Sequence, residues 1–387
     1  MTELLAPPPS LAADTILGTG SRHAGVDNLK IVLVTGVIVG HATMAWTNVG
    51  NWIFEEPVVR EPLLSLLVSV SMIGAAFAMP LFFLIAGAFT SGSLARKGPK
   101  RFLSDRAIRL GVPVLFYVIL LSPLIEYVDP GNAGWDRGFA AFVTYIWWPP
   151  AWGPTWFLVV LLAFSAAYAG IRTLVPPRPT VAAPPRGWHL AGLVVLLAVA
   201  SWLVRFGVPL GEEPLPLRFA LGQSPAWVIG FVLGVVGGER GWYAPMDQAF
   251  ARRARHAAWV AIAGFVIIFG GLLAAEVDLD ELAGGGTLLS LLAAVLEAGL
   301  VVTVPLWMLD LFHRRFGRQG SLARTASRAA FAAFVIHQLV LVGFVLASHQ
   351  VTWPPEVEYL TVSILAVAAS FAVAALALRV PGVAKVV

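Results

Sequence analysis

The sequence predicts an all-α integral membrane protein, a polytopic bundle of about ten transmembrane helices. Hydrophobic residues make up 58% of the 387 positions and charged residues 12%, and the mean hydropathy of +0.81 is far above that of soluble globular domains. Apolar runs long enough to cross about 30 Å of hydrocarbon recur along the chain. Ten such runs are predicted to span the membrane, at residues 29–48, 66–91, 107–127, 154–174, 188–206, 218–237, 256–275, 287–311, 329–348 and 358–379.

The distribution of positive charge supports this count and predicts the orientation of the chain. All but four of the 26 lysines and arginines fall on one side of the alternating spans, and the exceptions are Arg60, Arg137, Arg205 and Arg218. Loops on the cytoplasmic side are enriched in lysine and arginine, so we expect both termini to be cytoplasmic. The loops on the opposite side are short and acidic, so no soluble domain is expected there.

Composition also excludes several classes of protein. The net charge of +4 is explained by membrane topology, so no nucleic-acid binding is expected. The chain has no cysteine, which excludes disulfides and cysteine-ligated metal, and no metal site is expected. Residues 1–21 contain three consecutive prolines and no apolar core, which predicts a disordered cytoplasmic tail and no cleaved signal peptide. Residues 22–380 form the predicted transmembrane domain, and 381–387 form a short cytoplasmic tail.

The first span carries two titratable side chains on one helix face. Lys30 and His41 are eleven residues apart, which is close to three helical turns and about 16 Å of rise. Ionisable groups inside a membrane are costly and indicate function, and an imidazole suits a general base. The alternatives are a neutral His41 bonded to a neighbouring helix and a Lys30 that extends to the membrane edge. Asp27 is either a first-turn acid or the partner that holds Lys30 for an anionic ligand.

Two further ionisable residues lie in the middle of predicted spans. Glu297 is surrounded by apolar residues in the eighth span, where a glutamate must be protonated or paired. It is a candidate catalytic residue that orients His41 or relays a proton, and the alternative is a structural hydrogen bond between helices. His337 lies within the ninth span and supports either the substrate or the structure.

The second span and the loop after it suggest a binding site for a phosphorylated ligand. Six cations lie between Arg96 and Arg109, and Arg106 and Arg109 are spaced to share a helix face. Guanidinium groups suit phosphate, although such a cluster also attracts anionic lipid. Pro80 is expected to kink the second span, and Gly87 permits close backbone approach, either by a ligand or in helix packing alone.

The longest outer loop, about residues 128–153, is rich in aromatic residues and too short to span. It is predicted to be an interfacial or re-entrant element, as an aromatic belt at the membrane boundary or as a wall over an outward-facing acceptor cleft. Trp156 follows this loop and is expected to support the substrate or the structure. No internal repeat is evident, which weakly disfavours an inverted-repeat transporter.

Five motifs in this order resemble the membrane-bound acyltransferase family 3. They are Asp27-Asn28-Leu29-Lys30 with His41, Met79–Phe89, Arg106–Pro113, Thr155–Leu158 and Phe334–Gln338. The resemblance extends over residues 22–378. It implies a ten-span protein that acylates sugars and other hydroxylated acceptors, often outside the cytoplasm.

The resemblance also implies roles for individual residues. The family's first span has an arginine, ten residues and an essential histidine; here Lys30 takes the place of the arginine, and His41 is the histidine. Arg106 and Arg109 match the family's basic motif, and His337 matches the histidine near the end of its pattern. The small-Gly-Phe turn appears at residues 86–89, with alanine in place of the usual serine and one extra residue. Glu297 has no assured counterpart.

Together these observations predict an acyl-CoA-dependent O-acyltransferase in a bacterial inner membrane. Acyl-CoA, expected to be acetyl-CoA, would bind from the cytoplasm through Lys30, Arg106, Arg109 and Gly87, with its thioester near His41. The acceptor would be a hydroxylated compound such as a sugar. A proton-coupled secondary transporter that uses His41, Glu297 and His337 is the alternative. A haem protein with His41 and His337 as axial ligands is a third hypothesis.

Overall fold

The computed structural model describes residues 24–50, 52–145, 149–175, 187–215, 217–242, 248–278 and 280–386, so the predicted tail at 1–21 lies outside the described residues. Within these ranges, ten helical segments are long and apolar enough to cross a membrane, one for each predicted span. They are α1 (Ala24–Thr47), α2 (Leu63–Lys97), the segment Pro99–Tyr127, the segment Gly153–Leu174 that contains α7 (Trp156–Leu174), α8 (Gly187–Val204), the segment Leu221–Arg240 that contains α9 (Ser224–Arg240), α10 (Gln248–Ala274), α12 (Leu288–Arg315), α13 (Ser321–Ser348) and α14 (Pro355–Ala377).

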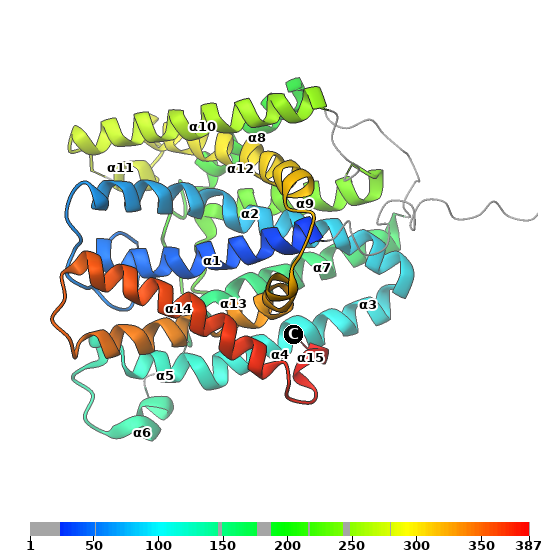
Figure 1. Ribbon diagram of the computed structural model, residues 1–387. Helices are drawn as coiled ribbons and strands as arrows, with labels where there is room; N and C mark the ends of the chain where they lie inside the picture. Colours follow the sequence, from blue (N-terminus) through cyan, green and yellow to red (C-terminus); the bar gives the residue numbers. More distant parts are fainter. Residues whose placement is uncertain are drawn as a thin grey trace, which may run out of the picture.

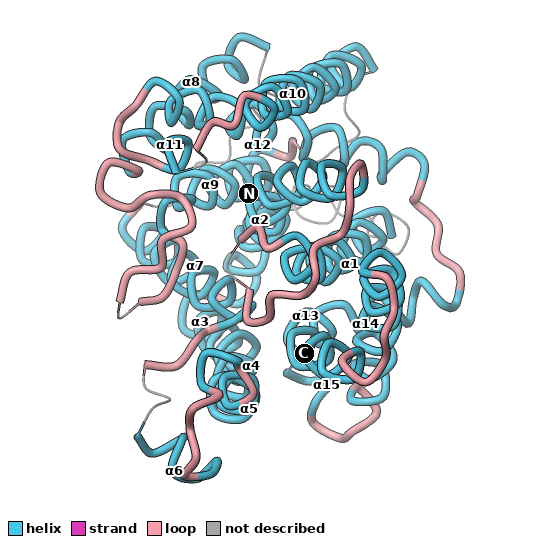
Figure 2. The backbone as a smooth tube through the Cα atoms, turned by 90° about the vertical axis from the view of Figure 1, so that its left-hand side faces the viewer, coloured by secondary structure: helices cyan, strands magenta, loops and turns pink. Residues whose placement is uncertain are grey.

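The long helices lie side by side, and the beginning of α1 and the short helix α15 (Val383–Val386) lie at the same end of the bundle (Figure 1). We call this the predicted cytoplasmic end and the other the predicted outer end. Viewed along the helices, α1 lies among α2, α12, α13 and α14, and it contacts all four (Figure 2). The leucines that α1 buries at its beginning therefore pack on α2 and α12, while its later residues join the main core with α13 and α14.

A stripe of small residues joins α2 to α9. Gly230, Gly234 and Gly238 recur every four residues and face the α2 backbone, where a Cβ on Gly234 would overlap with the carbonyl oxygen of Leu84. Gly87 of α2 faces the same contact, since a Cβ there would overlap with the carbonyl oxygen of Phe231. Such small-residue stripes allow transmembrane helices to approach closely where no hydrophobic effect drives their association.

The third span is the least regular of the ten. It consists of α3 (Pro99–Arg106), η1 (Ala107–Gly111), α4 (Val112–Phe116), η2 (Tyr117–Leu121) and α5 (Ser122–Tyr127), in which η1 and η2 are π-helical turns. Pro113 and Pro123 each follow one of these turns by two residues. Proline lacks an N–H and crowds the carbonyl one turn earlier, and wider π turns accommodate that loss. The segment after this span contains the short helix α6 (Gly138–Tyr145), and residues 146–148 of the predicted aromatic loop lie outside the described residues.

The glycine contact predicts a matched pair of stability effects. Gly234→Ala is expected to lower the free energy of unfolding by about 1–3 kcal/mol, the usual cost of overpacking, because α2 and α9 must separate. Gly264→Ala on α10 serves as the control, since its Cβ would meet nothing within 4 Å and alanine favours a helix over glycine. Thermal unfolding of both variants in detergent measures the difference, and equal melting temperatures would contradict the packing assignment.

Candidate active site

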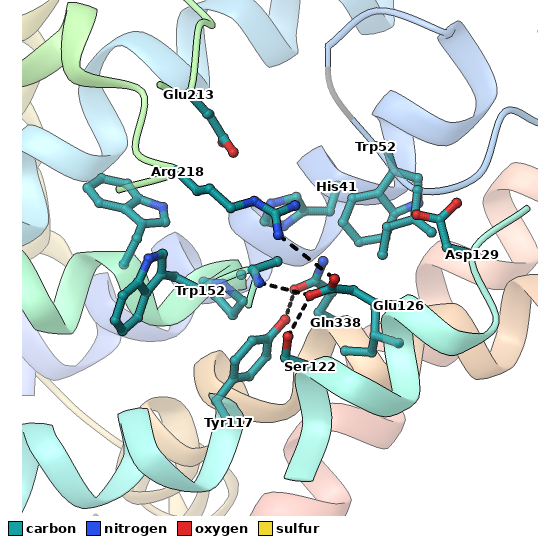
Figure 3. A pocket seen from close by; sticks show the side chains of 16 residues that line it. His41, Trp52, Tyr117, Ser122, Glu126, Asp129, Trp152, Glu213, Arg218 and Gln338 are labelled. Atoms are coloured by element: carbon teal, nitrogen blue, oxygen red, sulfur yellow. Dashed lines mark hydrogen bonds and ion pairs between the residues drawn. The ribbon is translucent and has the colours of Figure 1, made fainter. Parts of the chain in front are cut away.

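A cavity of about 420 Å³ lies at the predicted outer end of the bundle. Its wall is formed by the last turns of α1, the loop after α1, the third span, the segment before α7, the loop before α9 and the middle of α13. Its lining includes the labelled residues His41, Trp52, Tyr117, Trp152 and Gln338 (Figure 3). Trp156 and four charged side chains also line it. The cavity is therefore lined both by loop residues and by residues at buried helix positions, and it is large enough for a small-molecule ligand.

His41 and His337 form a hydrogen bond at this cavity. The Nε2 atom of His337 lies 3.0 Å from the Nδ1 atom of His41, and the Nδ1 atom of His337 lies 2.7 Å from the backbone carbonyl oxygen of Phe334. His337 is fully buried on α13, whereas His41 lines the cavity and packs against the ring of Trp52, with 5.0 Å between centroids. The sequence placed both histidines inside the membrane, and the fold brings them into contact.

The carbonyl of Phe334 determines which nitrogen of each ring carries a proton. A carbonyl oxygen only accepts, so the Nδ1 atom of His337 must donate to it. A neutral imidazole has one donor and one acceptor, so the Nε2 atom of His337 accepts and the Nδ1 atom of His41 donates. The Nε2 atom of His41 is then left with a lone pair, which is the state that a general base requires. The direct contact between the two rings also leaves no space for a haem plane between them.

Tyr117 and Gln338 form a second polar contact in the cavity wall. The hydroxyl of Tyr117, on the π-helical turn η2, donates to the Oε1 atom of Gln338, which follows His337 on α13. Gly153 adopts a φ of +46° beside this pair, and a Cβ there would overlap with the hydroxyl of Tyr117 and with Oε1 of Gln338. Sequence analysis did not identify this group as functional. The sequence offered one indication of this group, because Gln338 directly follows His337 in the motif Phe334–Gln338.

Four charged side chains line the same cavity. Glu126 accepts hydrogen bonds from Ser122 Oγ and the backbone N–H of Ala151, both at 2.8 Å. Arg218 Nη1 lies 3.8 Å from Glu126 Oε2 and 2.9 Å from the carbonyl oxygen of Pro149, to which it donates. The other two charged side chains in the wall are Asp129 and Glu213.

The protonation of one of these acids is shifted by its surroundings. Burial raises the pKa of Glu213 above its ordinary value, and the guanidinium of Arg218 opposes that rise. The cavity thus has an acidic rim with one cation. From the sequence, Asp129, Glu213 and Arg218 were considered only as features of topology, and Glu126 was not identified.

Aromatic rings form another part of the wall. Trp156 lines the cavity and packs on Trp227 of α9, with ring centroids 4.5 Å apart. Trp152, in the predicted aromatic loop, packs on Phe219, with centroids 5.7 Å apart. The cavity wall thus combines the flat apolar rings of tryptophans with hydrogen-bonding side chains.

The predicted donor-binding residues lie near the other end of the bundle. Lys30 forms an ion pair with Asp27 at 3.0 Å, and its Nζ atom lies 5.8 Å from the centroid of the Phe89 ring. Arg106 donates to the hydroxyl of Thr90 at 3.1 Å. The two cations therefore lie against adjacent residues of α2, although 76 positions separate them in the sequence.

Two other predicted donor-site residues have different environments. Arg109 is exposed on η1. Gly87 lies in the contact with α9, in agreement with the packing alternative considered for it. Its role in donor binding stays a prediction.

Glu297 is paired with a residue that sequence analysis did not connect to it. Its carboxylate accepts from Arg205, a fully buried arginine just after α8 that also donates from Nε to the carbonyl oxygen of Gly222 at 3.2 Å. Its neighbour Ala298 packs with buried residues of α8 and α9. The lining of the cavity described above does not include Glu297. The geometry therefore supports the structural alternative, and a catalytic role for Glu297 stays a prediction.

A bundle of ten helices long and apolar enough to cross a membrane defines a polytopic integral membrane protein. The chain belongs to the acyltransferase-3 family, because residues 23–379 match the family's acyltransferase domain. It is 30% identical to glucans biosynthesis protein C of Salmonella gallinarum over 115 residues, which cover 28% of this chain and 29% of the relative. It is 33% identical to nodulation protein NolL of Mesorhizobium japonicum over 108 residues, which cover 28% and 26%.

These matches span between a quarter and a third of the relatives' length. No solved structure shows significant similarity to the chain. The family assignment therefore rests on the match to the domain, which covers nearly the whole sequence.

The Arg205 pair predicts a stability effect that is separable from catalysis. Glu297→Gln leaves a buried guanidinium without its counter-charge, which typically costs about 3–5 kcal/mol. The melting temperature in detergent should therefore fall sharply, while the folded protein keeps its turnover. The double variant Arg205→Met/Glu297→Leu should recover most of the stability, because apolar replacement of a buried pair is often neutral. A Glu297→Gln variant of normal stability and lost turnover would instead show a catalytic role.

Proposed function

We propose that this protein transfers an acyl group, expected to be acetyl, from acyl-CoA to a hydroxyl of a carbohydrate acceptor, with His41 as the general base. The observation that carries the proposal is the hydrogen bond between His41 and His337 at the cavity, since it leaves a lone pair on Nε2 of His41. The family assignment supports the reaction class. The expected setting is a bacterial inner membrane, with the donor bound at the cytoplasmic end.

The donor would extend along α1. Lys30 and Arg106 lie against adjacent residues of α2 near the predicted cytoplasmic end, and both are suited to phosphate as charged donors. His41 is eleven residues further along α1, about 16 Å of helical rise, a span of the order that a pantetheine arm can bridge. Phosphates at one end and a thioester at His41 are therefore compatible with one extended molecule.

The acceptor would enter the cavity from the predicted outer end. The rings of Trp52, Trp152 and Trp156 offer flat apolar surfaces to the C–H faces of a sugar, and the carboxylates of Glu126 and Glu213 can accept hydrogen bonds from its hydroxyls. The first relative carries the name of a protein of glucan biosynthesis. A carbohydrate is therefore the acceptor class that the site fits best.

The chemical step requires one proton to move twice. The acceptor oxygen attacks the thioester carbon while Nε2 of His41 takes the proton of the acceptor hydroxyl. The C–S bond then breaks and releases the thiolate of CoA. The thiolate takes the same proton back from the imidazolium of His41. His337 accepts from Nδ1 of His41 throughout and keeps the ring in its working orientation. In an alternative route, the same nitrogen would attack the thioester first and form an acyl-histidine intermediate.

The base can be tested directly. His41→Ala is expected to lower kcat by about 10²–10⁴-fold, the usual contribution of a general base, in a protein that still folds, although the lost hydrogen bond to His337 should lower its melting temperature. His256→Ala, an exposed histidine on α10, serves as the control and should keep full activity. Release of CoA thiol from acetyl-CoA by purified protein in detergent measures both variants. Full activity in folded His41→Ala would refute the proposed role.

The donor site has its own test. Lys30→Ala and Arg106→Ala should each weaken acyl-CoA binding by about tenfold, or about 1.4 kcal/mol, because each removes a positive charge from the phosphate site. Arg252→Ala at the exposed beginning of α10 is the matched control for loss of a cation. Calorimetric titration with acetyl-CoA gives the dissociation constants, and unchanged binding in both variants would rule out this location.

Identification of the acceptor requires a comparison of cells with and without the protein. Mass spectrometry of envelope glycans and small metabolites should show the loss of an acyl group when the protein is absent. The transporter alternative makes a different prediction, since it moves a substrate across reconstituted vesicles without release of CoA thiol.

A further inference from the structure

Acyl transfer creates a negative charge that His41 does not neutralise. When the acceptor oxygen attacks, the electron pair of the thioester carbonyl moves to its oxygen, and this oxyanion requires hydrogen-bond donors already in place. His41 is occupied with the proton of the acceptor. Another group in the cavity wall must therefore supply a donor close to the base.

Several donors in the wall are unsuited to this task. The hydroxyl of Ser122 donates to Glu126, and Arg218 Nη1 is directed to Pro149 and Glu126. The indole nitrogens of Trp52 and Trp152 are shielded from the cavity contents, since both are buried. The particular donor atoms named here are therefore already engaged in the wall or shielded from the cavity.

Gln338 has the required geometry. It follows His337 on α13, lines the cavity together with His41, and is drawn below His41 in the view of Figure 3. The hydroxyl of Tyr117 donates to Oε1 of this amide. Because Oε1 is held on that side, the Nε2 group with its two N–H donors is turned away from Tyr117 and towards the cavity.

The surroundings hold this orientation firmly. Tyr117 is 1% exposed and projects from the π-helical turn η2. Gly153 closes over the pair with a φ of +46°, where a side chain would be strained and would also overlap with both partners. Three segments distant in sequence thus converge to fix one amide, a degree of preorganisation that a catalytic donor needs.

We propose that Gln338 is a catalytic residue whose Nε2–H donates a hydrogen bond to the thioester oxygen as it becomes an oxyanion, with Tyr117 as its positioning residue. This inference rests on the proposed acyl transfer. The amide neither gains nor loses a proton: its hydrogen bond strengthens as the carbonyl electron pair moves to oxygen. It weakens when that pair returns to re-form the carbonyl and the thiolate of CoA departs.

Gln338→Met tests the inference, because methionine has a similar shape and no N–H donor. With acetyl-CoA as donor, and a soluble glucan oligosaccharide or water as acceptor, kcat for CoA thiol release should fall by about 10²–10³-fold, the usual effect of removing one oxyanion donor. The KM for acetyl-CoA should stay within about threefold of wild type, since ground-state binding does not use this bond. Gln350→Met, an exposed glutamine just beyond α13, is the control and should behave as wild type.

Tyr117→Phe provides a second, independent variant. This variant keeps the amide of Gln338 but removes the Tyr117 hydroxyl that orients it. We therefore expect kcat to fall by a smaller factor than in Gln338→Met. The pH dependence of kcat should keep the shape set by His41. Thermal unfolding in detergent establishes that each variant is folded. An active wild type with a folded Gln338→Met variant within about threefold of its kcat would overturn the inference. A wild type that releases no CoA thiol would instead refute the proposed function itself.

Discussion

The chain of hydrogen bonds from the Phe334 carbonyl through His337 to His41 is the interaction on which the site depends. A buried imidazole requires hydrogen-bond partners, and here each ring provides one for the other. Because the carbonyl accepts only, the direction of the whole chain follows, and His41 is left with a lone pair at the cavity. The contact between α1 and α13 that aligns the rings is therefore both a packing contact and a determinant of the protonation state.

The backbone beside the cavity is irregular. The π-helical turn η2 in the third span carries Tyr117, which lines the cavity wall. Irregular backbone inside a membrane is tolerated where protein surrounds it or where it lines a cavity, and the third span meets that condition.

The first helix places Lys30 and His41 near its opposite ends. Lys30 and Arg106 lie near the end where α1 begins, and His41 lies close to where it ends. A rigid helix is well suited to hold two such groups at a constant separation. The buried pair of Arg205 and Glu297 lies among α8, α9 and α12, where it joins helices that surround the site without lining the described cavity. The Arg205–Glu297 pair is therefore separate from the cavity that His41 lines.

The sequence by itself determined the ten spans and the shared face of Lys30 and His41, because hydropathy and helical periodicity are local properties of the chain. It also identified His337 and Glu297 as unusual, since an ionisable residue in an apolar run is visible without a fold. Only the tertiary structure decided their partners: His337 meets His41 across 296 positions, Gln338 meets Tyr117 across 221, and Glu297 meets Arg205 across 92. These pairings depend on how each helix is rotated against its neighbours, and that rotation results from packing over the whole bundle.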